Sequence, residues 1–136
     1  MEIPILVLLT PLIAYLVAGS LKFILNSFRH QSLAFEHIGM GGFPSTHNTI
    51  TSSTSSAIGF SLGFSTIEFL ICLTVMFIVG IDSLDLRQKI AFHAQRLNQL
   101  KQSEKPLRVS LGHKPHEVVG GVVLGLFIGF CTSNLS

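Results

Sequence analysis

The amino-acid sequence predicts an all-α fold: an integral membrane helix bundle with about four spanning helices and one amphipathic helix at the surface. Hydrophobic residues make up 48% of the 136 residues and charged residues only 12%, about half the charged share of a soluble domain. Long uncharged runs alternate with short polar stretches. One further segment mixes apolar and charged residues at helical spacing. The length indicates a single domain, which we place over residues 1–136.

The first uncharged run, Ile3–Gly19, has 17 residues, which is the lower limit for a helix that crosses a bilayer. A cleaved signal peptide is the alternative. The run follows Glu2 rather than a basic segment, and no cleavage site of small residues is convincing. We therefore expect a retained helix, with Lys22 and Arg29 at its exit.

The second uncharged run, Asn48–Phe64, follows a glycine-rich turn. Nine of the twelve residues from Ser45 to Ser56 are Ser or Thr, a composition that also suits a flexible linker. No charge or proline interrupts the run, and its second half is apolar. Closely packed membrane helices use small hydroxyl residues at their contacts. The run therefore predicts a buried helix.

The third spanning helix is expected over Ser65–Ile81, with Glu68 near its start; because only 13 residues separate Glu68 from Asp82, we expect it to be short or tilted. The amphipathic helix is expected over Leu84–Glu104, lying on the membrane surface or folded against the bundle. The last uncharged run, Val118–Leu135, carries Gly121, Gly125 and Gly129 at four-residue intervals. That spacing puts three glycines on one helical face and predicts close packing against another helix.

Four spans place all nine Lys and Arg residues on one side of the membrane. The positive-inside rule makes that side cytoplasmic, in an inner or plasma membrane. The net charge of +2 and the absence of a dense basic face argue against nucleic acid. Cys72 and Cys131 lie in apolar runs, and we interpret them as small hydrophobic side chains rather than a disulfide.

Two groups of residues on that side suit an anion. Lys22 and Arg29 are cations with six residues between them, although charges also simply anchor helix ends at headgroups. Gly41 to His47 leads directly into a helix, whose N-terminus attracts phosphate. Ser45 adds a hydroxyl donor, and His47 adds a group that titrates near neutral pH. An ordinary capped helix with an incidental histidine is the alternative for this second group.

A third group, Leu111 to Glu117, enters the last helix. Glu117 lies four residues after His113, so its carboxylate can hold one ring nitrogen and leave the other unoccupied. His116 competes for this part, but Glu117 is its direct neighbour and points to another face. A His-x3-Glu spacing could also supply half of the ligands of a metal site. No further ligand cluster accompanies it, so we expect no metal.

Together the three groups resemble the type 2 phosphatidic acid phosphatase superfamily, and most closely its divergent branch, related to acid phosphatases and vanadium-dependent haloperoxidases. The segments that carry the resemblance are Gly-Gly-Phe-Pro-Ser-Thr-His at 41–47, Asp-Ser-Leu-Asp-Leu-Arg at 82–87 and Leu-Gly-His-Lys-Pro-His-Glu-Val at 111–118. Phe43 replaces the usual Met and Thr46 replaces Ser or Gly. Glu117 replaces the Asp of the wider superfamily but matches the branch. For the second arginine the branch favours Arg87, with Arg108 as the alternative.

The resemblance implies a metal-independent phosphatase without a cofactor, acting on a lipid phosphate. His113 would form a phosphohistidine with its ring held by Glu117, and His47 would serve as acid and base. The phosphate would be bound by Lys22, Arg29, Ser45, Arg87, Gly42 and Thr46. Phosphatidylglycerophosphate is the favoured substrate for a cytoplasmic site; phosphatidate and polyprenyl pyrophosphate stay open. A non-catalytic protein that binds or moves phospholipid is the rival function, and a homodimer stays open.

Overall fold

The computed structural model describes residues 3–30, 42–100, 107, 109 and 112–135. All regular secondary structure in these ranges is helical: α1 Ile5–Leu8, α2 Thr10–His30, α3 Thr46–Leu62, α4 Ile67–Leu84, α5 Leu86–Leu100 and α6 Pro115–Asn134. The predicted all-α helix bundle is therefore confirmed.

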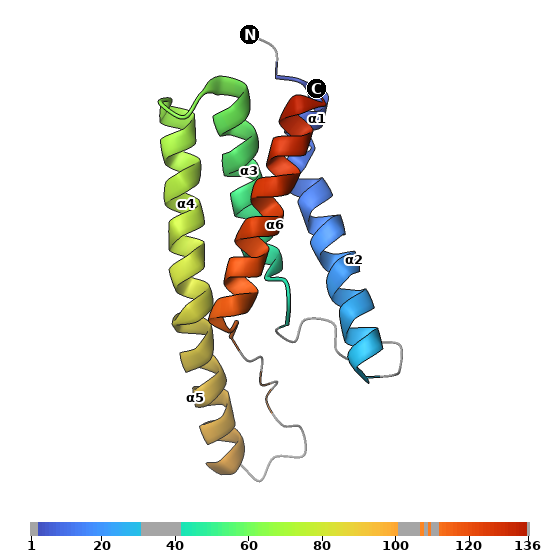
Figure 1. Cartoon of the computed structure of the whole chain (residues 1–136). Coiled ribbons are helices and arrows are strands. Elements are labelled where there is room, and N and C mark those ends of the chain that lie inside the picture. Colours follow the sequence, from blue (N-terminus) through green and yellow to red (C-terminus); the bar gives the residue numbers. More distant parts are fainter. Residues whose placement is uncertain (1–2, 31–41, 101–106, 108, 110–111, 136) are drawn as a thin grey trace.

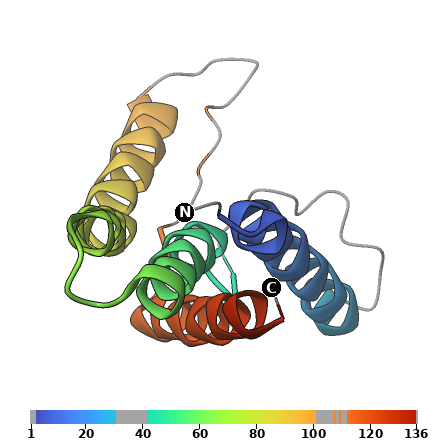
Figure 2. The same ribbon diagram turned by 90° about the horizontal axis from the view of Figure 1, so that it is seen from above.

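Helix α3 occupies the centre of the bundle, with α2, α4 and α6 around it (Figure 2). Helices α2 and α4 run in one direction and α3 and α6 in the other, so α3 and α6 both begin at the end of the bundle where α2 and α4 finish (Figure 1). The N- and C-terminal ends of the chain lie together at the opposite end. This topology brings the three predicted groups of functional residues to one end.

The interior of the bundle is polar, and its outer surface is apolar. Eight residues of α3 are buried, and six of them are Asn, Ser or Thr: Asn48, Thr49, Ser52, Ser53, Ser55 and Ser56. Large apolar side chains such as Ile71 and Phe77 of α4 are 58% and 68% exposed. A water-soluble domain would bury such side chains, whereas a bilayer solvates them and leaves polar groups to be satisfied inside.

Apart from Ser61 Oγ, which has no partner among the described residues, the buried hydroxyls of α3 form hydrogen bonds within the bundle. Thr49 Oγ1 donates to the Ser45 carbonyl at 2.9 Å, and Ser52 Oγ donates to that of Asn48 at 2.6 Å. Such bonds to the preceding turn let Ser and Thr sit in an apolar medium without another partner. Ser56 Oγ instead crosses to the Leu126 carbonyl of α6 at 2.9 Å and links the two helices.

The glycine face of α6 packs directly on the α3 backbone, as the sequence predicted. A Cβ added at Gly121 would lie 2.5 Å from the Ser45 carbonyl oxygen, and one at Gly129 would lie 2.6 Å from Ser56 Cβ. At Gly125 it would collide with Ser52 Oγ and the Thr49 carbonyl. Only glycine permits this approach of two helix backbones.

One sequence prediction needs correction. The first helix continues past Gly19 to His30, so Lys22 lies within α2 rather than beyond its end; Leu21, Phe23 and Ile24 keep the segment apolar enough to continue. By length and composition, three described segments can cross a membrane: Thr10–Phe28, Ile67–Leu100 and Pro115–Asn134. The expected fourth, α3, is a helix but is more polar, because other helices rather than lipid cover it.

Helix α5 follows α4 after a break at Asp85 and extends beyond the other helices (Figure 1). Among the described helices it contacts α4 alone. Ala91 is its buried residue, whereas Leu86, Ile90 and Leu97 are about half exposed. The predicted amphipathic helix is therefore present and projects from the end of α4 instead of folding against the bundle.

Candidate active site

The starts of α3 and α6 lie side by side and share hydrogen bonds. The Ser45 backbone N–H donates to the Glu117 carbonyl oxygen at 2.9 Å. Ser45 is the N-cap of α3, and Lys114 is the N-cap of α6. Two helix N-termini, each with a partial positive charge, therefore meet at one place.

His113 and Glu117 adopt the predicted arrangement in this region. His113 Nδ1 lies 3.0 Å from Glu117 Oε2, and the same oxygen accepts from the Lys114 backbone N–H at 3.1 Å. The backbone N–H of Gly42 also bonds the carboxylate. His113 is only 5% exposed. With Nδ1 bonded to the carboxylate, Nε2 is the ring atom that is left to react.

The backbone of His113 is held by the end of α4 and the beginning of α5. Its N–H donates to the Ser83 carbonyl at 3.2 Å, and its carbonyl accepts from Gln88 Nε2 at 3.2 Å. A Cβ at Gly112 would lie 2.8 Å from the Gln88 backbone nitrogen. Sequence reasoning missed Ser83 and Gln88, because nothing in their spacing relates them to a histidine far along the chain.

The surroundings of His113 favour its neutral form. Burial lowers the pKa of His113 below the ordinary histidine value, while the hydrogen bond and the charge of Glu117 raise it by less. The positive charges of Lys22 and Arg87 add to the lowering of this pKa. A neutral imidazole has a lone pair on its unprotonated nitrogen, which a nucleophile requires.

His47 lies in the first turn of α3 and is exposed. The charges of Arg87, His113 and Lys22 all act on it, as does the carboxylate of Asp82. The two predicted histidines therefore lie within electrostatic reach of each other and of both cations. One is buried and tightly held, and the other is open to the surface.

Two of the predicted cations reach the site from different helices. Lys22 of α2 is half-buried and interacts electrostatically with Glu117. Arg87 of α5 forms an ion pair with Asp82, Nε to Oδ2 at 3.4 Å, with both side chains about one-third exposed. Arg29 is in the last turn of α2, and its side chain lies outside the described residues, as does Arg108.

The loop before α3 has a different hydrogen-bond pattern from the one expected for a phosphate cradle. The N–H groups of Gly42 and Ser45 both bond Glu117, and Pro44 has no N–H group. These backbone groups fix Glu117 rather than pointing to an open site. Thr46 is the first residue of α3 and is half-buried, and Ser45 is fully buried.

Asn48 is a buried residue beneath the site that sequence reasoning also missed. It has no exposed surface, and its Nδ2 donates to Ser45 Oγ at 2.9 Å and to Ser83 Oγ at 3.1 Å. It therefore joins the start of α3 to the turn of α4 that holds His113. An asparagine within a run of Ser and Thr was the available signal.

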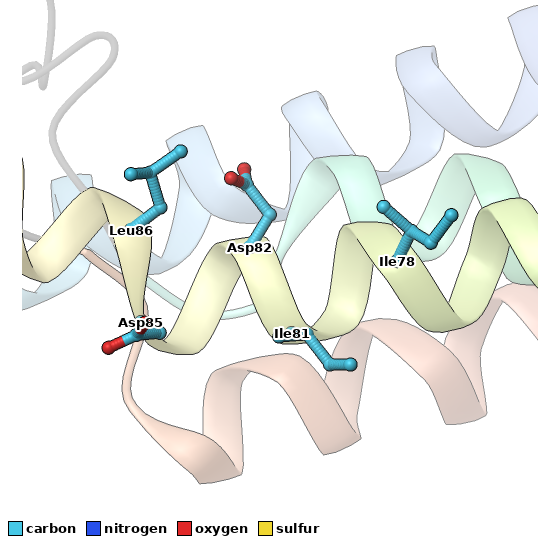
Figure 3. Close-up of a pocket in the computed structure, with 5 residues that line it drawn as sticks. All are labelled: Ile78, Ile81, Asp82, Asp85 and Leu86. Atoms are coloured by element: carbon cyan, nitrogen blue, oxygen red, sulfur yellow. The ribbon is translucent and has the colours of Figure 1, made fainter.

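Two cavities lie apart from the two histidines. One of about 270 Å³ is a depression on α4 and the start of α5, with Ile78, Ile81, Asp82, Asp85 and Leu86 on its described walls (Figure 3). The other, of about 280 Å³, lies between α3, α4 and α6 near the opposite end and includes Phe60, Phe64 and Phe130. Neither is lined by His47 or His113.

Metal ligands do not cluster in the described part of the chain: no group of three or more His, Cys, Asp or Glu side chains there could hold an ion. His113 and Glu117 bond each other rather than facing a common point. The polar groups that converge here are two histidines, a carboxylate and cations. This set suits acid–base and nucleophilic chemistry on an anion.

Three helices long and apolar enough to cross a bilayer, with a polar interior, make this chain an all-α membrane protein. Its residues 5–128 match the model of the Divergent PAP2 family. The chain belongs to that family. Comparison with curated proteins and with solved structures found no match.

Proposed function

We propose that this protein is a membrane lipid phosphate phosphatase that works through a phosphohistidine on His113. One observation carries the proposal: His113 is buried, its Nδ1 is bonded to Glu117 at 3.0 Å, and a second histidine and two cations act on the same region. Membership of the Divergent PAP2 family supports the phosphatase class.

In the first step, the lone pair of His113 Nε2 attacks phosphorus, and the bond between phosphorus and the ester oxygen breaks. Protonated His47 gives its proton to the departing oxygen, which leaves as the lipid alcohol. Glu117 stabilises the positive charge that develops on the His113 ring. This sequence follows the general logic of a nucleophile oriented by a third group.

In the second step, neutral His47 takes a proton from water as the water oxygen attacks phosphorus. The bond between phosphorus and Nε2 breaks, inorganic phosphate leaves, and His113 regains its lone pair. The exposure of His47 suits this part, because water must reach it in every cycle.

The phosphate oxygens need positive charge and donors, since phosphoryl transfer depends on positioning and charge neutralisation. Lys22 and Arg87 supply charge, and we place Arg29 beside them. Ser45 and Thr46 supply hydroxyl groups at the α3 N-terminus. Gly42 contributes indirectly, because its N–H holds the Glu117 carboxylate.

We place the site at the cytoplasmic side, where lysines and arginines accumulate in membrane proteins, and favour phosphatidylglycerophosphate as the substrate. In a variant without Cys72 and Cys131, a cysteine at Gln95 should resist an impermeant thiol reagent in intact cells. A cysteine at Asn134, at the other end of the bundle, should react. The reverse pattern would place the site outside and favour lipids dephosphorylated there, such as polyprenyl pyrophosphate.

The decisive experiment measures inorganic phosphate released by the purified protein from a panel of lipid phosphates, with EDTA present. Turnover with EDTA, and an acid-labile phosphoryl group on His113 after rapid quenching, are expected. Loss of turnover that zinc or magnesium restores would contradict the metal-independent mechanism. Binding of lipid phosphates without any phosphate release would favour a phospholipid-binding protein instead.

A further inference from the structure

Asn48 makes two hydrogen bonds that together determine which of its side-chain atoms faces the site. Nδ2 donates one hydrogen to Ser45 Oγ at 2.9 Å and the other to Ser83 Oγ at 3.1 Å. All three residues have no exposed surface. In such a setting the direction of each hydrogen bond matters, because an unpaired donor or acceptor is costly.

Ser83 fixes the orientation of the amide. Its hydroxyl donates to the Val79 carbonyl at 2.7 Å, so its single hydrogen is used and its oxygen can only accept from Asn48. If the amide were turned over, Oδ1 would face an oxygen that has no hydrogen to offer. The observed orientation leaves Asn48 Oδ1 without a partner in the described part of the chain.

The same orientation determines what the Ser45 hydroxyl can do. Because Ser45 Oγ accepts from Asn48, its own hydrogen must point elsewhere, and within the described residues that hydrogen has no acceptor. Ser45 is the N-cap of α3, beside the segment that carries Glu117 and His113. An anion bound at this helix end is the acceptor that such a donor fits.

We propose that Asn48 is a positioning residue that makes Ser45 a permanent hydrogen-bond donor to the bound phosphoryl group. The two hydrogen bonds run in series, from Asn48 Nδ2–H to Ser45 Oγ and from Ser45 Oγ–H to a phosphate oxygen. Ser83 holds the Asn48 amide in place. The inference rests on the proposed function for the presence of a phosphoryl group at Ser45.

The test uses binding of orthovanadate, a phosphate analogue, by the purified full-length protein, so it requires no turnover. Asn48→Asp has nearly the same shape but only accepts. It draws the Ser45 hydrogen away from the anion, and vanadate binding should weaken roughly 10- to 100-fold. Asn134→Asp makes the same chemical change at the exposed far end of α6 and should leave binding unchanged. Melting temperatures in detergent report whether each variant folds.

Ser83→Ala is the second, uncharged variant, and it removes a single oxygen atom. Without that hydroxyl the Asn48 amide can turn over, so vanadate binding should weaken severalfold. If both residues act through Ser45, this loss should disappear in a Ser45→Ala background. Three results would overturn the inference. The first is that the losses caused by Ser83→Ala and Ser45→Ala multiply in full in the double variant. The others are unchanged vanadate binding in Asn48→Asp and no vanadate binding by the unaltered protein.

These outcomes separate the inference from the proposed function. If the unaltered protein releases phosphate and Asn48→Asp binds vanadate equally well, the inference fails and the phosphatase proposal stands. If the unaltered protein binds vanadate in an Asn48-dependent way without releasing phosphate, the inference stands and the phosphatase proposal fails.

Discussion

Helices α3 and α4 are neighbours of nearly equal length, 17 and 18 residues, yet α3 buries eight of its residues and α4 buries one. In α3 the buried residues are mostly Ser, Thr and Asn, whereas in α4 Ser83 is the one buried residue. The apolar side chains of α4 face outward. The comparison teaches that polarity, rather than hydrophobicity, marks the inside of this bundle.

The two helices also differ in what they contribute to the site. Helix α3 begins at the site and provides Ser45 at its cap, His47 and Asn48. Helix α4 ends there and contributes the Ser83 carbonyl that holds His113. The lipid-facing side of α4 should be replaceable without loss of chemistry, whereas the polar side chains at the starts of α3 and α6 should not.

The largest difference in activity is expected between a variant of the proposed nucleophile and a variant of the lipid-facing surface. His113→Ala should reduce phosphate release to background, because no other group would attack phosphorus. Ile71→Ala, on the exposed side of α4, should retain activity. Phosphate release at matched protein concentration measures both, and rapid quenching should trap phosphohistidine only where His113 is intact. Turnover by the alanine variant would remove His113 from the nucleophile role.

A smaller loss of activity is expected when a cation of α5 is removed. Arg87→Ala should lower kcat/KM on the order of a hundredfold, the typical loss when one charge-stabilising group is removed from a reaction centre. Lys89→Ala is the matched control, because Lys89 pairs with Asp85 at 2.8 Å with both side chains mostly exposed. Steady-state kinetics compares the two. A larger loss in Arg108→Ala than in Arg87→Ala would assign the second arginine to Arg108.

The contact between α3 and α6 should respond through stability rather than chemistry. Gly125→Ala forces a Cβ against the α3 backbone, including Ser53 N at 2.9 Å, and should destabilise the fold by about 1–3 kcal/mol. Gly19→Ala has open space around its Cβ and should be neutral or slightly stabilising. Thermal unfolding in detergent measures both. Equal melting temperatures would show that α3 and α6 can separate without cost.

The smallest effect concerns pH. Protonated His113 cannot attack, and burial lowers the pKa of His113, so the acid limb of kcat/KM should lie below about 6.5, the ordinary histidine value. Glu117→Gln removes the charge that raises this pKa. Its residual activity should therefore fall off at a still lower pH. A limb that shifts to higher pH in the variant would contradict this account of the His113 environment.

The sequence alone was sufficient to predict features that depend on local spacing. Glu117 follows His113 by one helical turn at the start of α6, so the 3.0 Å contact could be expected. The glycines of α6 repeat every four residues, so their common face and its close packing could be expected too. Uncharged runs predicted the helices, because a bilayer requires apolar side chains over a fixed length.

Only the tertiary structure decided which distant groups meet. Ser83 and Gln88 hold His113 although 30 and 25 residues separate them from it, and Asn48 links Ser45 to Ser83 across two helices. In the tertiary structure the Gly42 N–H also bonds Glu117, and α5 contacts α4 alone among the described helices. These outcomes depend on how helices approach one another. That approach is set by packing over whole faces, which no single spacing in the chain encodes.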